Sequence, residues 1–530
     1  MAQPDNARAT VRIGGPAARI SPSIFGGLAE HFGTSVNDGM WDRSTGEARA
    51  DVKAAITAMG VGLIRYPGGC YSAAYHWKDG VGPRDQRPYQ ARTMWTELGE
   101  RLGSMLTAVP GLTPERLGQL MGPPEPNLVG TDEFLQYCVD IGAEPLLVAN
   151  LGTGTPEEAA EWVRYTMRPA SPRRVRWWGV GNETYGSHEP GHAPPAEYGK
   201  RLAEFSQAMK AVDPGIRIIG VGLPAFPPEL ASDPDGLIVA YDAREWNEGV
   251  LGAAAADIDA LSLHWYFPGM VGRPLSGLDD YAQLVTSPDL LDQALTHTIG
   301  LVDELTGDHR LMFSVDEWNR MVELEDHFGT NHTLADAGFF AGVYTVLLNH
   351  ADRVSISCIS HLVNCLAPIQ APAPGQMFPT AAYLIGQLYA GLATGTTRQV
   401  EVNADQVLVP ALTSIQVIGP GGLAAEPRTG RGLVAAATTA GQRNVIFLTS
   451  RHLDRPTVVT VTGLPVAQAA ARWRVLAGPD LFAANTLEHP GTLYWSEDSI
   501  AVTGGHAEVT LPPGGTGALI VGPAAEDQAS

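Results

Sequence analysis

Short apolar runs alternate with amphipathic segments along most of the chain. Segments 131–143 ("TDEFLQYCVDIGA") and 195–214 have apolar positions three to four apart, which favours helices. The apolar runs are rich in Val, Ile and Leu and mostly do not alternate with polar residues, which is typical of strands buried on both faces. These predicted strands are Ile24–Leu28, Gly62–Tyr66, Pro145–Ala149, Trp177–Val180, Ile216–Val221, Ala260–His264, Leu311–Val315 and Arg353–Ile359. Repeated strand–helix alternation predicts an α/β fold, a (β/α)₈ barrel over residues 20–388.

The pattern changes after residue 388. Segments such as "RNVIFLTS" and "TVVTVTGLP" are short and separated by Gly, Pro and Asp, so residues 389–530 are predicted to form an antiparallel β-sandwich. Residues 1–19 contain the strand-like "ATVRIGG", which we expect to pair with that domain. Residues 96–126 are predicted to form an inserted helical rim or lid, although their apolar positions could equally pack on barrel helices.

Composition excludes several functional classes. The net charge is −22 with no basic patch, which argues against nucleic acids and anionic membranes as partners. No run approaches 18 apolar residues, so no membrane span is expected, and the N-terminal stretch lacks the apolar region of a secretory signal. The four cysteines, Cys70, Cys138, Cys358 and Cys365, show no CxxC spacing. Reduced thiols and a cytoplasmic location are therefore predicted.

Two glutamates follow predicted barrel strands, on the face where barrel enzymes hold their active sites. Glu183 lies in "WWGVGNETYG" and Glu317 in "LMFSVDEWN", both with aromatic neighbours. Glycoside hydrolysis needs one carboxyl group that stays protonated to assist the leaving oxygen and a second that is ionised. Aromatic rings pack against the C–H faces of sugars. The pair therefore predicts a glycosidase.

Further polar residues follow the first, second, sixth and eighth predicted strands. Each has a structural alternative: Arg65 could pair with a core carboxylate, Cys70 could fill space, and His264 could be a core histidine. Their convergence on one face favours a shared pocket. The residues concerned are Glu30, His31, Arg65, Cys70, His264, Tyr266, His361 and Asn364.

Two other functional classes stay open at this point. His31, His264 and His361 with Glu30 could hold a divalent ion in a metal-dependent barrel enzyme, although no HxH or HExxH spacing supports this. A non-catalytic carbohydrate-binding protein would be favoured by loss of either glutamate, and both are present.

Several motifs in order resemble the α-L-arabinofuranosidases of glycoside hydrolase family fifty-one over nearly the whole chain. They are "FGGLAEHFG", "IRYPGGCYSAAYHWKDGVGP", "GTDEFLQYC", "WWGVGNE", "LSLHWYF", "DEWN" and "LVNCLAPI". The short "GNE" occurs in many barrel glycosidases, but the ordered set is specific. The resemblance implies a barrel with a jelly-roll-like C-terminal sandwich, retention of anomeric configuration, no cofactor and a homo-oligomer.

The resemblance also implies roles for individual residues. Glu183 is expected to be the general acid/base and Glu317 the nucleophile. Arg65 is expected to lie against Glu317 and keep it ionised, Tyr266 to contact the nucleophile, and Asn182 to bind the hydroxyl beside the reacting carbon. The residues expected to bind substrate are Glu30, Arg65, Cys70, Trp95, Asn182, His264, Tyr266, Met321 and His361.

Three features depart from the family pattern. The family usually has Gln where this chain has His361 and often an aromatic residue where it has Met321, and the 96–126 insertion is unusual. These departures do not change the predicted reaction class, but they leave more than one sugar as a candidate substrate. The expected substrate is an arabinose-containing oligosaccharide, with another furanoside (D-arabinofuranoside or galactofuranoside) or a β-glucan as alternatives.

Overall fold

The computed structural model describes residues 6–89, 126–226, 241–267, 275, 277–307, 309–320, 332–411, 427–464 and 468–522. Most of the predicted insertion 96–126, with Trp95 and Met321, lies outside these residues. None of the described helices has the length and apolar character needed to cross a membrane.

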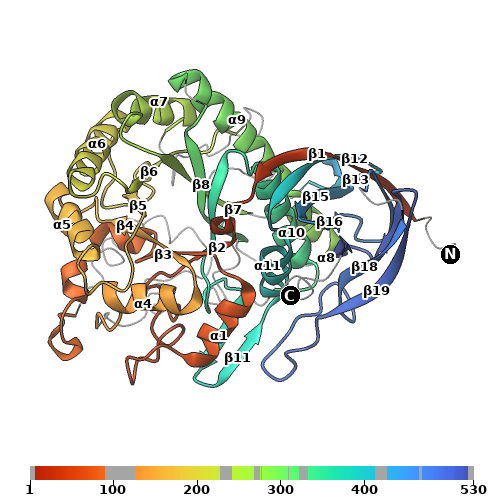
Figure 1. Cartoon of the computed structure of the whole chain (residues 1–530), viewed down its shortest axis with the longest axis horizontal. Helices are drawn as coiled ribbons and strands as arrows, with labels where there is room; N and C mark the ends of the chain where they lie inside the picture. Colours follow the sequence, from red (N-terminus) through yellow and green to blue (C-terminus); the bar gives the residue numbers. More distant parts are fainter. Residues whose placement is uncertain are drawn as a thin grey trace.

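Within the described residues, parallel strands close into a barrel in sequence order, which fills the left of Figure 1. The barrel strands are β2 (Gly26–Leu28), β3 (Leu63–Tyr66), β4 (Glu144–Ala149), β5 (Trp177–Val180), β6 (Arg217–Val221), β7 (Ala260–Phe267), β8 (Met312–Arg320) and β9 (Val354–Ile359). This closure confirms the predicted (β/α)₈ class.

Helices surround the barrel (Figure 1). The α-helices are α1 (Ala50–Met59), α4 (Thr131–Ile141), α5 (Pro156–Thr166), α6 (Pro195–Val212), α7 (Ala243–Ala254), α8 (Gly277–Thr286), α9 (Pro288–Thr306), α10 (Asp336–Asn349) and α11 (Ala381–Leu392). Short 3₁₀ turns are η1 (Pro22–Phe25), η2 (Cys70–Ala74), η3 (Trp77–Gly80) and η4 (Arg84–Gln86), and β10 (Ile369–Ala373) pairs with β11 (Gln376–Pro379).

The predicted limits of three barrel strands are wrong by two or more residues. The first strand is shorter than predicted, because Pro22 starts a 3₁₀ turn that Ser21 caps. Strands β7 and β8 run on to Phe267 and Arg320, so Glu317 lies inside β8 rather than after it. The polar residues of β8 remain in the strand because they are buried and paired with other elements, which their sequence pattern does not show.

The C-terminal domain is one large sheet of strands (Figure 1, right). Its order is β19-β18-β21-β16-β15-β12-β1-β17-β20, with every pair antiparallel except β1 with β17. The strands are β1 (Ala7–Arg19), β12 (Thr396–Ala404), β15 (Leu433–Ala440), β16 (Arg443–Ser450), β17 (Thr457–Thr462), β18 (Gln468–Ala477), β19 (Tyr494–Thr503), β20 (Ala507–Leu511) and β21 (Thr516–Val521), beside the hairpin β13 (Gln406–Val409) and β14 (Arg428–Arg431).

The sheet encloses its own core and rests on the barrel through a buried helix. Val459 of β17 and Trp473 of β18 belong to one hydrophobic cluster although their strands lie near opposite ends of the sheet, so the sheet curls on itself. On its other face Phe447 of β16 stacks on Tyr389 of α11, with ring centroids 4.3 Å apart. Helix α10 is buried along Asp336–Leu348 because it packs against both domains.

Candidate active site

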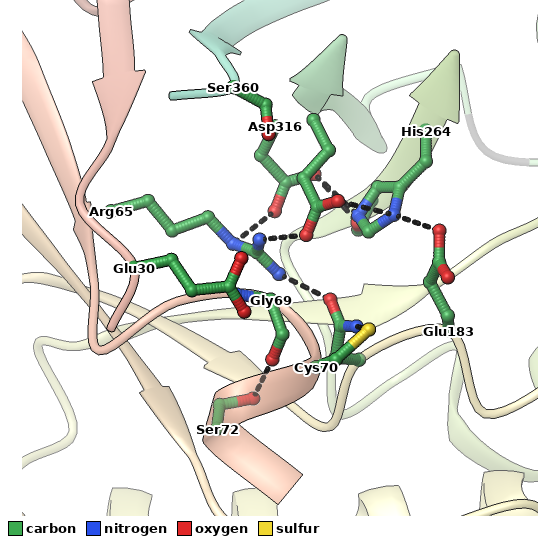
Figure 2. A network of polar contacts seen from close by, with 12 residues as sticks. Glu30, Arg65, Gly69, Cys70, Ser72, Glu183, His264, Asp316 and Ser360 are labelled. Atoms are coloured by element: carbon green, nitrogen blue, oxygen red, sulfur yellow. Dashed lines mark hydrogen bonds and ion pairs between the residues drawn. The ribbon is translucent and has the colours of Figure 1, made fainter. Parts of the chain in front are cut away.

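A buried arginine organises the acidic groups at the barrel mouth. Arg65, on β3, is 1% exposed. Its Nη1 donates to Glu317 Oε1 at 2.5 Å, its Nη2 to Asn182 Oδ1 at 2.8 Å, and its Nε forms an ion pair with Asp316 Oδ2 at 3.3 Å. Figure 2 shows the guanidinium in the middle of this network. One cation thus fixes side chains from β8 and from the loop after β5.

The second oxygen of Glu317 is held by a phenol. Tyr266 on β7 donates to Glu317 Oε2 at 2.9 Å, and its hydroxyl lies 2.7 Å from Ser360 Oγ. Burial and the neighbouring Glu317 raise the pKa of Tyr266 well above its usual value, so it remains a hydrogen-bond donor. Glu317 therefore has both oxygens oriented and a cation beside one of them, which suits a nucleophile held ready for attack.

Glu183 sits on a strained turn directly after β5. Its φ of 39° lies in the left-handed region, which costs a non-glycine residue on the order of 1 kcal/mol and recurs at functional sites. Three donors converge on its carboxyl group: His264 Nδ1 at 2.8 Å and Tyr185 OH at 3.2 Å from Oε1, and His188 Nε2 at 3.1 Å from Oε2.

Glu183 and His264 share a proton. Burial disfavours a charge on Glu183, yet hydrogen bonds from His188 and His264 outweigh it and hold the pKa of that carboxyl below its usual range. Burial likewise opposes a charge on His264, but Glu317 and Glu183 raise the pKa of His264 to about 9. In the free protein near neutral pH, the proton between them therefore rests on the imidazole.

A further carboxylate lies across the site from Glu183. Glu30 Oε1 accepts from the backbone N–H groups of Gly69 and Tyr71, each at 3.0 Å, and Oε2 lies 2.9 Å from His361 Nε2. Burial would raise the pKa of Glu30, but the contact with His361 lowers it below its usual value. The ring of His361 stacks on Phe32, with centroids 5.7 Å apart.

The two candidate catalytic carboxyl groups are close. One oxygen of Glu183, one of Glu317 and a ring nitrogen of His264 all lie within 4.8 Å of one another. In Figure 2 the imidazole of His264 lies beside Glu183. The polar lining, the paired carboxyl groups and the barrel mouth together fit a sugar-cleaving site.

Comparisons with known proteins agree with this geometry. The family model for the α-L-arabinofuranosidase 1 domain matches residues 55–247, and that for the α-L-arabinofuranosidase C-terminal domain matches residues 316–514. A crystal structure of the α-L-arabinofuranosidase from Thermotoga maritima in complex with arabinose superposes with a TM-score of 0.79 at 26% identity, covering 97% of this chain and 99% of that one. The chain is an α-L-arabinofuranosidase-like glycoside hydrolase.

Two sequence relatives of this hydrolase are named intracellular exo-α-(1→5)-L-arabinofuranosidases. The protein from Acetivibrio thermocellus is 28% identical over 411 residues, covering 68% of this chain and 71% of the relative. That from Streptomyces lividans is 26% identical over 509 residues, covering 89% of this chain and 68% of the relative. The family fifty-one enzyme from Thermotoga petrophila superposes with a TM-score of 0.78 at 26% identity, covering 97% of this chain and 100% of that one.

The structure brings most of the predicted site residues of the hydrolase into one network. This network contains Glu30, Arg65, Cys70, Asn182, Glu183, His264, Tyr266, Glu317 and His361. Trp95 and Met321 lie outside the described residues. Asn364 is set apart from the network, because its side-chain amide donates to Thr34 O at 2.9 Å and so fastens a loop.

The rival metal-ligand set does not assemble. Glu30 and His361 are in contact, but His31 Nε2 lies 3.2 Å from Tyr66 OH and His264 is bonded to Glu183. In the described part of the chain, the groups with metal-ligand spacing are other sets, Cys70 with Glu183, His188 and Glu189, and Glu183 with His264 and Glu317. The alternative ligand set of His31, His264, His361 and Glu30 is therefore not among the groups with metal-ligand spacing in the described residues.

Among the described residues, the enzyme's site includes residues that were not predicted from sequence, such as Asp316, His188, Glu189 and Ser360. Asp316 accepts from Ser262 Oγ at 2.6 Å and pairs with Arg65. Asn182 Nδ2 donates to Glu189 Oε1 at 3.1 Å. His188 and Glu189 follow Glu183 in the same loop, a few residues further along the sequence. This closeness in sequence is the feature from which their place in the site could have been predicted.

The glycine turn after β3 gives a sharp test of this packing. A Cβ on Gly69 would lie 2.1 Å from Glu317 Oε1 and 3.4 Å from Asn182 Oδ1. Gly69→Ala is expected to displace the nucleophile and lower kcat/KM by about 100-fold, since displacements near 1 Å can have that effect. Steady-state kinetics with Gly15→Ala as control, where a Cβ meets nothing within 4 Å, checks this. Full activity of Gly69→Ala would contradict the tight contact.

Proposed function

We propose that this chain is a retaining exo-glycoside hydrolase that releases terminal α-L-arabinofuranosyl residues by double displacement. The single observation that carries the proposal is the closeness of the Glu183 and Glu317 carboxyl groups, with oxygens within 4.8 Å. Retaining enzymes hold the two groups about 5–5.5 Å apart, whereas inverting enzymes leave about 6.5–9.5 Å for a water molecule. The names of the relatives and structural neighbours support the choice of sugar.

In the first step Glu317 attacks the anomeric carbon and the glycosidic bond breaks. The leaving oxygen takes the proton held by the Glu183–His264 pair, and the product is a glycosyl ester on Glu317. Arg65 and Tyr266 hold Glu317 in line with the anomeric carbon. In the second step Glu183 removes a proton from water, which attacks the same carbon and releases the sugar with its original configuration.

Other side chains of the network are suited to bind the furanose hydroxyls. Glu30 is ionised and Asn182 is fixed by Arg65 and Glu189, so their polar groups are preorganised. His361 orients Glu30 and puts an imidazole where the family usually has an amide. The hydrogen-bond pattern offered to the sugar therefore differs from that of the family.

A substrate panel tests the proposed function. The enzyme should cleave p-nitrophenyl α-L-arabinofuranoside, and kcat/KM should be compared with the D-arabinofuranoside, β-D-galactofuranoside and β-D-glucopyranoside. His361→Gln should raise kcat/KM on the arabinoside several-fold if the imidazole weakens the fit, since one hydrogen bond contributes about 1 kcal/mol. Higher activity on another sugar for both forms would overturn the assignment of substrate.

The shared proton predicts the alkaline limb of the pH profile. His264 has its pKa raised to about 9, so the Glu183–His264 pair keeps its proton at neutral pH and loses it as pH rises through that value. We expect kcat/KM to fall above about pH 9. In His264→Gln the limb should move to lower pH by at least about one unit, because the imidazole no longer stores the proton. Profiles of both forms on a substrate with a poor leaving group check this, and an unchanged limb would refute the shared proton.

We also propose a cytoplasmic location and a homo-oligomeric state. The names of relatives that are called intracellular support the location. The family resemblance supports the oligomer, and analytical ultracentrifugation would measure its size. A monomer at micromolar concentration would refute it.

A further inference from the structure

We propose that Cys70, Glu183, His188 and Glu189 form an inhibitory binding site for a soft divalent cation of the Zn²⁺ class. One ligand atom from each of these side chains lies within 4.8 Å of the others. Binding itself does not depend on the proposed function, whereas inhibition rests on the proposed role of Glu183 as acid/base.

The spacing of the ligand atoms fits a tetrahedral ion. Zn²⁺ binds S, N and O ligands at about 2.0–2.3 Å, which places neighbouring ligand atoms roughly 3.3–3.7 Å apart. His188 Nε2 is already 3.1 Å from Glu183 Oε2 and 3.7 Å from Glu189 Oε1. The remaining pairs need side-chain shifts on the order of 1 Å to close around an ion.

The ligand types select the kind of cation. A thiolate with an imidazole and two carboxylates suits Zn²⁺ and similar ions such as Co²⁺, while Mg²⁺ and Ca²⁺ prefer oxygen ligands alone. In the sequence these residues come from two places only, Cys70 at the start of η2 and the loop after β5. In Figure 2 the Cys70 sulfur and the Glu183 carboxyl group lie on the same side of the Arg65 guanidinium.

A buried carboxyl oxygen without a hydrogen-bond partner supports the same site. Glu189 is fully buried, and its Oε2 has no hydrogen-bond partner within the described residues. His188, which would bind the ion through Nε2, has only 10% of its side chain exposed. An unsatisfied buried carboxyl group is costly, and a divalent cation would offset that cost. Burial raises the pKa of Glu189 to about 7 and that of the Cys70 thiol well above its usual value, so binding would release protons to the buffer.

Within the described residues, the second group with metal-ligand spacing is a poorer site. Glu183, His264 and Glu317 already satisfy one another and their neighbours, because Glu317 is bound by Arg65 and Tyr266 and Glu183 Oε1 by His264. A cation there would have to break these contacts and lie beside the guanidinium. The site around Cys70 leaves Arg65 paired and includes Glu189, whose Oε2 has no hydrogen-bond partner within the described residues.

Inhibition follows from the use of Glu183 as a ligand. A coordinated carboxylate cannot take up the proton that the leaving oxygen needs. No electrons move, and the only covalent bonds that break are the S–H bond of Cys70, the O–H bond of protonated Glu189 and the N–H bond of His188 Nε2, whose protons go to the buffer. Activity should return when a chelator removes the ion.

Titration of the intact enzyme with Co²⁺ and Zn²⁺ tests the site. One equivalent of Co²⁺ should bind and give the visible spectrum of a four-coordinate ion with a near-ultraviolet thiolate charge-transfer band. Zn²⁺ should displace the bound Co²⁺. Cys70→Ser should lose the charge-transfer band. Glu189→Gln should weaken inhibition by Zn²⁺ at least tenfold, while His76→Gln, which removes a surface histidine paired with Glu158, should leave inhibition unchanged. Mg²⁺ and Ca²⁺ should have no effect.

Two results would overturn the site: no thiolate band with Co²⁺, or equal inhibition of wild type and Glu189→Gln by Zn²⁺. The outcomes also separate this proposal from the proposed function. A thiolate band with undiminished hydrolysis would uphold the site and contradict the role of Glu183. Hydrolysis as proposed without the band would uphold the function and remove the site.

Discussion

Glu317→Ala is expected to lower kcat by roughly four or more orders of magnitude on every substrate, good leaving group or poor. The loss is large because the side chain forms the covalent bond in the first step, and no neighbour can replace it. Arg65 and Tyr266 hold both its oxygens in place, so the carboxylate is prepared for attack before substrate arrives. Steady-state rates on aryl and alkyl arabinofuranosides measure the effect.

Two further variants separate chemistry from folding. Glu317→Gln keeps the shape of the side chain and an oxygen that accepts from Arg65, so it should melt near the wild-type temperature. It should be as inactive as Glu317→Ala, because an amide cannot replace the carboxylate as nucleophile. Glu508→Ala, at an exposed position on β20, should match wild type in both activity and stability. If Glu317→Gln retains more than about 1% of wild-type kcat, a different group is the nucleophile.

Glu183→Ala is expected to distinguish substrates by their leaving groups. Alkyl and sugar leaving groups need a proton, so their kcat/KM should fall by about 10²–10⁴-fold. A dinitrophenolate needs little protonation, and its kcat/KM should fall by less than about tenfold. His188 and His264 lose their shared acceptor in this variant, so its melting temperature must be measured beside its rates.

Azide gives an independent check on Glu183. It attacks the glycosyl ester without base assistance, so it should raise kcat of Glu183→Ala on an activated substrate and form the glycosyl azide of retained configuration. Wild type should not respond, because its own base already activates water. Equal losses on good and poor leaving groups, with no response to azide, would show that Glu183 has another role.

Much of the barrel could be predicted because its strands are buried on both faces and therefore apolar. The run Trp177–Val180 matches β5 to the residue, since it is followed at once by the turn that carries Glu183. The extension of β8 through Glu317 could not be predicted in this way. Its buried charges are compensated by Arg65 from β3 and Ser262 from β7, which are distant in the sequence.

The strand order of the C-terminal sheet could not be predicted from the sequence pattern either. The alternation in β1 predicts a strand, but nothing in it shows that β1 pairs with both β12 and β17. In the site, the sequence pattern placed both Glu183 and Glu317 after apolar strands, and the structure keeps Glu183 after β5 but sets Glu317 inside β8. His188 and Glu189 were not predicted as site residues, because their contacts depend on the path of the loop. The loop turns these side chains back toward Glu183 and Asn182.

Capture of the glycosyl intermediate by methanol tests double displacement through Glu317 most directly. The enzyme is given p-nitrophenyl α-L-arabinofuranoside in the presence of methanol, and the first methyl glycoside formed is assigned by NMR. The close carboxyl groups predict methyl α-L-arabinofuranoside, the retained product. Formation of the β-anomer, or hydrolysis with no methyl glycoside at all, would contradict the mechanism.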